Sequence, residues 1–169
     1  MAASRVMSGV EPPPFQALLD AHGRDVHRFL IALVGRTDAD DCYQETWLSA
    51  LRAYPRLREA PNLRGWVMTI AHRKAMDHLR ATRRRAVPAA ELPEGELPEA
   101  AAPDPVLARE DDVWGRVAVL PPKQRAAVAL RFLADASYAE VAAVMETSEE
   151  AARRNVFEAL KHLRREMAA

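Results

Sequence analysis

The chain has 169 residues, of which 49% are hydrophobic and 28% charged, and it contains a single cysteine. This length suits one compact domain or two small ones, and the composition supports a packed core rather than a disordered chain. One cysteine excludes an intramolecular disulfide framework, and no apolar run approaches the roughly 18 residues of a membrane span. Since the N-terminus also lacks a signal-peptide pattern, we expect a cytoplasmic protein without membrane insertion.

The net charge of zero conceals a segregation of charge along the chain. Residues 1–86 carry a net charge of +5, residues 87–112 carry −7, and residues 113–169 carry +2. Two mildly basic blocks therefore flank one acidic connector. Five of the twelve prolines also fall within residues 87–107. Because proline interrupts helices and like charges extend a chain, we expect a flexible, acidic, Pro-rich linker at 87–104.

The linker divides the chain into a flexible tail at 1–11, one domain at 12–86 and a second domain at 105–169. Helical periodicity dominates both domains, and no strand pattern of comparable strength is present. We therefore expect an all-α fold of two small helical domains.

Apolar spacing predicts two helices at the start of the first domain. The first covers residues 15–34 and ends at Gly35. Thr37 and Asp40 resemble a capping box that opens the second helix, and Pro55 ends it. The expected inner face of the second helix consists of Ala39, Tyr43, Trp47, Ala50, Leu51 and Tyr54.

The outer face of this second helix is acidic. The helix dipole explains part of the pattern, because carboxylates near a helix start are favoured. A remaining polar row includes one apolar residue and is typical of a helix that docks onto another protein. The row consists of Asp41, Gln44, Glu45 and Leu48.

A third, longer helix follows Asn62, a plausible N-cap. Its basic face suits a phosphate backbone, although the solvated face of an ordinary bundle fits equally well. Trp66 could stack on a base, but its apolar neighbours favour a place in the core. The basic face consists of Arg73, Lys74, Asp77 and Arg80.

In the second domain, Asp104 and Pro105 predict the N-cap and first turn of a helix that ends near Leu120. Another helix starts after Pro121 and runs through Phe132.

The end of the chain predicts a helix-turn-helix. Ser137 and Glu140 form a capping box for a short helix, and Ser148 caps a long basic helix that ends near Met167. Such turns usually contain glycine, whereas this one contains Glu146.

Support for catalysis is weak. The five histidines lack metal-binding spacing, no glycine-rich phosphate loop is present, and Cys42 has no evident activating base. We therefore expect a protein that is not an enzyme and that holds no metal or cofactor.

Three segments together resemble an RNA polymerase sigma factor of the extracytoplasmic-function group in the sigma-70 family. Residues 38–47 are similar to the family's polymerase-binding helix, and residues 61–80 are similar to its promoter-melting segment. Residues 120–132 and 137–142 are similar to its C-terminal helix-turn-helix domain. The resemblance implies a sigma-2 domain and a sigma-4 domain that direct promoter-specific initiation and assist DNA melting.

By this resemblance, core RNA polymerase would be contacted at its β′ clamp helices and β flap, and an anti-sigma factor would be a further partner. The polymerase-binding residues would be Asp38, Asp41, Gln44 and Glu45. The promoter −10 element would be bound by Asn62, Arg64, Arg73, Lys74 and Arg80. The −35 element would be bound by Ser148, Arg153, Arg154, Asn155 and Lys161.

Two other classes of protein stay open from the residues alone. One is a stand-alone helix-turn-helix regulator that binds duplex DNA without polymerase. The other is a helical adaptor that only binds proteins. The acidic second helix and the basic third helix favour the sigma factor, since a simple regulator needs neither.

Overall fold

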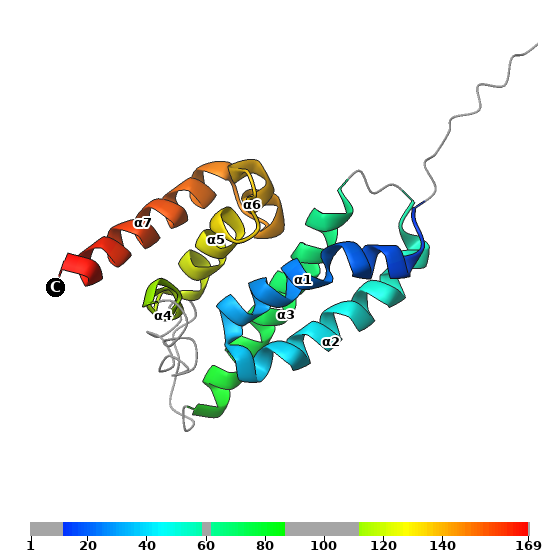
Figure 1. Cartoon of the computed structure of the whole chain (residues 1–169), viewed down its shortest axis with the longest axis horizontal. Coiled ribbons are helices and arrows are strands. Elements are labelled where there is room, and N and C mark those ends of the chain that lie inside the picture. The colour runs from blue at the N-terminus through cyan, green and yellow to red at the C-terminus, as the bar shows by residue number, and fades with distance from the viewer. Residues whose placement is uncertain (1–11, 59–61, 87–111, 169) are drawn as a thin grey trace, which may run out of the picture.

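The computed structural model describes residues 12–58, 62–86 and 112–168, and every regular element in these ranges is helical (Figure 1). The elements are α1 (Phe15–Val34), α2 (Arg36–Ala53), the short 3-10 helix η1 (Tyr54–Arg56), α3 (Leu63–Ala86), α4 (Asp112–Ala118), α5 (Pro122–Phe132), α6 (Tyr138–Val144) and α7 (Glu149–Ala168). The all-α prediction is confirmed. The expected tail, the expected linker and the expected cap at Asp104 lie outside the described residues.

Helices α1, α2 and α3 pack together into a bundle, which we call the first body. Its core is built from large apolar side chains that face one another from all three helices, such as Phe29, Trp47 and Val67. The predicted end of α1 is confirmed, because Gly35 takes a left-handed φ of 84° and donates its N–H to Ile31 O at 3.0 Å.

Two sequence predictions for α2 are wrong. The helix begins at Arg36, directly after Gly35, and no side chain caps it. Asp40 does not close a capping box but bonds to His27 Nε2 of α1 at 2.8 Å. Leu51 is not on the inner face: it is 50% exposed and lies three residues from Leu48, which is 52% exposed on the same side of the helix.

Helices α4 to α7 form the second body, and its local capping predictions are confirmed. Ser137 accepts from the Glu140 backbone N–H while Glu140 accepts from the Ser137 N–H, so the capping box of α6 is complete. Ser148 Oγ accepts from the N–H of Ala151 at 3.1 Å and caps α7. Helices α6 and α7 thus form the expected helix-turn-helix.

The two bodies pack directly against each other. Helix α5 lies against α1, and α6 lies against α3 (Figure 1). One apolar core runs through both, with Leu33 of α1 and Leu130 of α5 among its buried members. Arg125 of α5 is buried beside them and donates Nη1–H to Leu33 O at 2.5 Å, where α1 ends. None of the helices in the described ranges has the length and apolar character that a membrane span requires.

Candidate nucleic-acid interface

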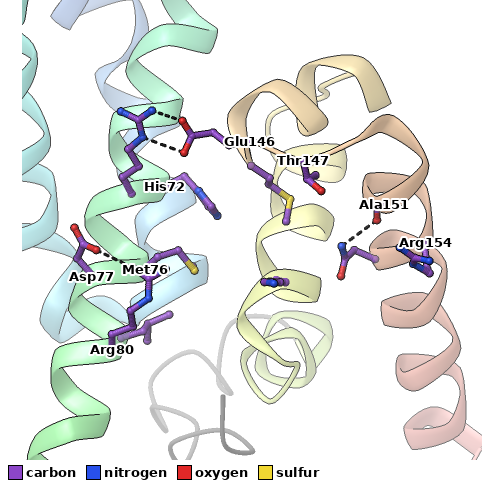
Figure 2. Close-up of a pocket in the computed structure, with 13 residues that line it drawn as sticks. His72, Met76, Asp77, Arg80, Glu146, Thr147, Ala151 and Arg154 are labelled. Carbon is purple, nitrogen blue, oxygen red and sulfur yellow. Dashed lines mark hydrogen bonds and ion pairs between the residues drawn. The ribbon is translucent and has the colours of Figure 1, made fainter. Parts of the chain in front are cut away.

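A cavity of about 750 Å³ lies between α3 of the first body and α5, α7 and the turn before α7 in the second body (Figure 2). Its lining is rich in charged side chains from both bodies. The cations are Arg73 and Arg80 of α3, Lys123 of α5 and Arg154 of α7, and the anions are Asp77 and Glu146. The basic face of α3 and the start of α7 therefore face each other.

The cations that α3 contributes are already paired. Arg73 Nε donates to Glu146 Oε2 at 3.2 Å, and its Nη2 donates to the other carboxylate oxygen. This bond and the charge of Arg73 lower the pKa of Glu146. Arg80 pairs with Asp77 at 3.0 Å, one turn away on the same helix. Lys74 is half-buried and does not line the cavity.

The predicted DNA-binding residues at the start of α3 have structural partners as well. Asn62 caps the helix, because its Oδ1 accepts from Gly65 N–H at 2.8 Å. A Cβ at residue 65 would lie 2.7 Å from Asn62 Nδ2, so a larger residue there would displace the side chain that caps the helix. Arg64 pairs with Asp25 of α1 at 3.3 Å and also donates to Ala134 O of the second body.

The predicted DNA-binding residues of α7 differ in their surroundings. Arg153 pairs with Glu149 at 2.5 Å, and its guanidinium lies 4.5 Å from the centre of the Tyr138 ring. Asn155 donates to Ala151 O at 2.9 Å and, like Arg154, borders the cavity. Lys161 lies exposed two turns further along the helix.

Helix α2 presents the predicted acidic row to solvent. Asp41, Gln44 and Glu45 are exposed, and none of them forms an ion pair within the described ranges. Leu48 continues the row as an exposed apolar side chain. Asp38 differs, because its carboxylate lies 3.1 Å from His78 Nε2 of α3. Three of the four predicted polymerase-binding residues thus form one accessible surface.

The sequence did not single out His72, which is buried at the edge of the cavity. Its Nε2 has no hydrogen-bond partner among the described residues. Burial lowers the pKa of His72 to about 4, with Arg80 and Arg73 acting in the same direction and Glu146 opposing them. The ring is therefore neutral at pH 7. In the part of the chain that the structure describes, no group of three His, Cys, Asp or Glu side chains is placed to hold a metal ion.

Two family descriptions match this chain over most of its length. Sigma-70 region 2 matches residues 18–85, and Sigma-70, region 4 matches residues 111–163. The ECF RNA polymerase sigma factor SigC of Mycobacterium tuberculosis is 36% identical over 131 residues, which cover 76% of this chain and 70% of SigC. The ECF RNA polymerase sigma factor BldN of Streptomyces coelicolor is 31% identical over 160 residues, covering 92% of this chain and 61% of BldN.

The fold is also similar to a solved structure. The sigma factor RpoE from Bartonella quintana, in its complex with the anti-sigma factor NepR, matches with a TM-score of 0.73 at 20% identity. The match covers 92% of this chain and 97% of that one.

Proposed function

The chain belongs to the ECF group of sigma-70 RNA polymerase sigma factors, and from this premise we propose how its surfaces divide the work of initiation. A factor of this family binds core RNA polymerase and promoter DNA and directs promoter-specific transcription initiation. The chain itself need not perform bond-making chemistry, because the polymerase supplies it. We place this activity in the cytoplasm.

The polymerase-binding surface is the acidic row of α2. Asp41, Gln44 and Glu45 are exposed beside Leu48, which gives a charged rim around an apolar contact. We assign this row to the β′ clamp helices. Asp38 is assigned to the same partner, although its carboxylate also pairs with His78 of α3.

The −10 element is assigned to α3. Arg64, Arg73, Lys74 and Arg80 supply cations along one helix, and phosphate contacts of this kind provide much of the affinity for DNA. Asn62 at the start of α3 would help to capture an unstacked base. Captured bases and phosphate contacts offset the energy of unstacking and unpairing that melting requires.

The −35 element is assigned to α7, which would enter the major groove with its first turns. Arg154 and Asn155 carry the side chains best suited to guanine and adenine edges. Ser148 and Arg153 have capping and ion-pair partners within the helix-turn-helix, so we place them at its phosphate-facing end. Lys161 would contact the backbone further along. The β flap would hold the second body in place.

One observation carries the proposal: an exposed acidic row on α2 and two basic helix faces, on α3 and α7, coexist in one chain. A regulator that binds only duplex DNA has no use for the acidic row. An anti-sigma factor is a further proposed partner, since the matching RpoE structure contains one.

The test is run-off transcription with core polymerase on a promoter mapped from start sites after overexpression. We expect promoter-specific RNA only when the protein is present. If the protein shifts duplex DNA but never supports run-off RNA, the stand-alone regulator is correct instead. If the protein binds polymerase but no DNA, with or without a promoter sequence, the protein-binding adaptor is correct.

A further inference from the structure

Three arginines join the two bodies, and each donates to an oxygen of the opposite body. Arg125 of α5 donates to Leu33 O at the end of α1. Arg64 at the start of α3 donates to Ala134 O, between α5 and α6. Further along α3, Arg73 donates through two nitrogens to the carboxylate of Glu146, in the turn between α6 and α7.

Two of these three arginines are ones that the proposed function assigns to promoter phosphates. A carboxylate and a phosphate present similar charged oxygens to a guanidinium group, and both are bound in the same two-pronged way. While Glu146 occupies Arg73, that guanidinium cannot bind a phosphate in the same geometry. The second body and the promoter are therefore competing ligands for one donor.

The backbone of Glu146 makes its presence in this turn notable. Its φ is 54°, in the left-handed region that glycine adopts without steric cost and that other residues adopt at a cost. The usual glycine of a helix-turn-helix turn would fit this conformation better, but it could not reach Arg73. Figure 2 shows the two contacts that the Glu146 carboxylate makes with α3. A residue with a strained backbone thus makes one of the three polar contacts between the bodies.

The contact also closes the space that DNA would need. Glu146 lies three residues before Glu149, the first residue of α7. A recognition helix works inside a major groove about 12 Å wide. A duplex cannot surround the start of α7 while the preceding turn is hydrogen-bonded to α3.

We propose that Glu146 is an autoinhibitory latch, whose carboxylate holds the second body on Arg73 so that the DNA-binding faces of α3 and α7 are turned toward each other. The effect on promoter binding rests on the proposed function, whereas the latch itself rests on the contacts between the bodies. Exposed ion pairs are weak, and Arg73 and Glu146 are both more than half exposed. The latch therefore adjusts the balance between closed and open forms and yields readily to a partner.

The test measures the distance between the bodies in the full chain without polymerase or DNA. Single-molecule energy transfer can use dyes at Ala53→Cys on α2 and Glu158→Cys on α7, because both positions are exposed and Cys42 is buried. For Glu146→Gln we expect the ratio of open to closed molecules to rise roughly two- to fivefold. High salt should raise the ratio in the unmodified protein and have little effect in the variant.

Two glycine variants separate the latch from the strain of the turn. Glu146→Gly should open the molecule as much as Glu146→Gln does, but with a higher melting temperature, since it also relieves the left-handed backbone. Asp135 has the same kind of conformation, with φ 49°, and lies outside the contact between Glu146 and α3. Asp135→Gly is therefore the control for backbone strain: it removes a left-handed side chain and the 3.8 Å pair with Arg131, but should leave the distance between the bodies unchanged.

A charge exchange completes the test. Arg73→Glu alone should open the molecule, and adding Glu146→Arg should close it again. If Glu146→Gln leaves the open fraction unchanged, or if the exchanged pair fails to restore closure, the latch is wrong, whatever the transcription assay shows. If Glu146→Gln opens the molecule but duplex affinity stays unchanged, the latch stands and the assignment of α7 to DNA is contradicted.

Discussion

The acidic surface of α2 and the basic surfaces of α3 and α7 differ in what already occupies them. Asp41 and Glu45 face solvent and form no ion pair within the described ranges. On α3, by contrast, Arg64 is bound by Asp25 and Ala134, and Arg73 is bound by Glu146. The surface assigned to polymerase is ready for its partner, while the surfaces assigned to promoter DNA are engaged with each other.

This difference teaches that charge alone does not make a surface available. Both regions have the composition expected of a binding face, and sequence patterning treats them alike. Only the arrangement of the bodies separates them.

The largest expected effect concerns the buried contact between the bodies that Arg125 makes. Arg125→Met removes the donor to Leu33 O and to Leu120 O. It leaves two buried carbonyls without that partner and should lower the free energy of unfolding by about 2–4 kcal/mol. Chemical denaturation measures the loss. Arg131→Met on the same helix is the control, because Arg131 bonds only within the second body, to Ala136 O and Asp135, and an equal loss in both variants would contradict the special role of Arg125.

A similar effect is expected from acid. The pKa of His72 in the folded protein is about 4, below its ordinary value of 6.5, because burial disfavours the charged ring. Between these two values the unfolded chain binds a proton that the folded chain does not. The contribution of neutral His72 to the free energy of unfolding is therefore complete above pH 6.5 and is lost as the pH falls toward 4. The loss amounts to about 3 kcal/mol.

The pKa of His22 is also lowered by burial, so His22 adds to the pH dependence of stability. Comparing the unmodified protein with His72→Leu separates the effect of His72 from that of His22. We expect the difference in unfolding free energy between the two proteins to vary with pH between 6.5 and 4. A constant difference would show that His72 is not buried as a neutral ring.

A smaller effect is expected at the DNA-binding end of α7. Arg154→Ala should weaken binding to a −35 duplex by about 1–3 kcal/mol, since this side chain faces the cavity and has no ion-pair partner among the described residues. Arg153→Ala should cost less, because Glu149 and Tyr138 already hold its guanidinium. Fluorescence anisotropy with matched and scrambled duplexes measures both. Equal losses on the two duplexes would make Arg154 a phosphate contact rather than a base reader.

The exposed acidic row of α2, which is assigned to polymerase, is tested by reversing its charge. Asp41→Lys or Glu45→Lys should weaken binding to core polymerase roughly tenfold, because a cation then replaces a carboxylate in the row assigned to the β′ clamp helices. The melting temperature should not change, since neither side chain has an ion-pair partner to lose. Asp20→Lys makes the same reversal of charge at an exposed position of α1 and should leave polymerase affinity unaltered. An equal effect from all three would indicate a response to net charge only.

The sequence predicted local features well because their causes lie within a few residues. Asn62 and Ser148 each cap a helix through a backbone N–H three residues ahead. Thr37 was misread because Gly35 already turns the chain, and Asp40 finds its partner on a different helix, at His27. A pattern of spacing cannot detect such a competitor.

Contacts between the bodies were beyond prediction for the same reason. Arg64 and Ala134 are 70 residues apart, and Arg125 and Leu33 are 92 apart. Nothing in the spacing around either arginine signals a partner at that separation. Glu146 is a partial exception. The sequence showed a charged residue where the turn favours glycine, but it did not show that Arg73 is its partner.

The lone cysteine has a consequence for how the protein can respond to its surroundings. Cys42 is buried in α2, and burial, with three nearby carboxylates, raises the pKa of its thiol to about 11. At neutral pH fewer than about one molecule in a thousand carries the thiolate that oxidants attack. The thiol of Cys42 should thus react only slowly with peroxide and with other disulfides.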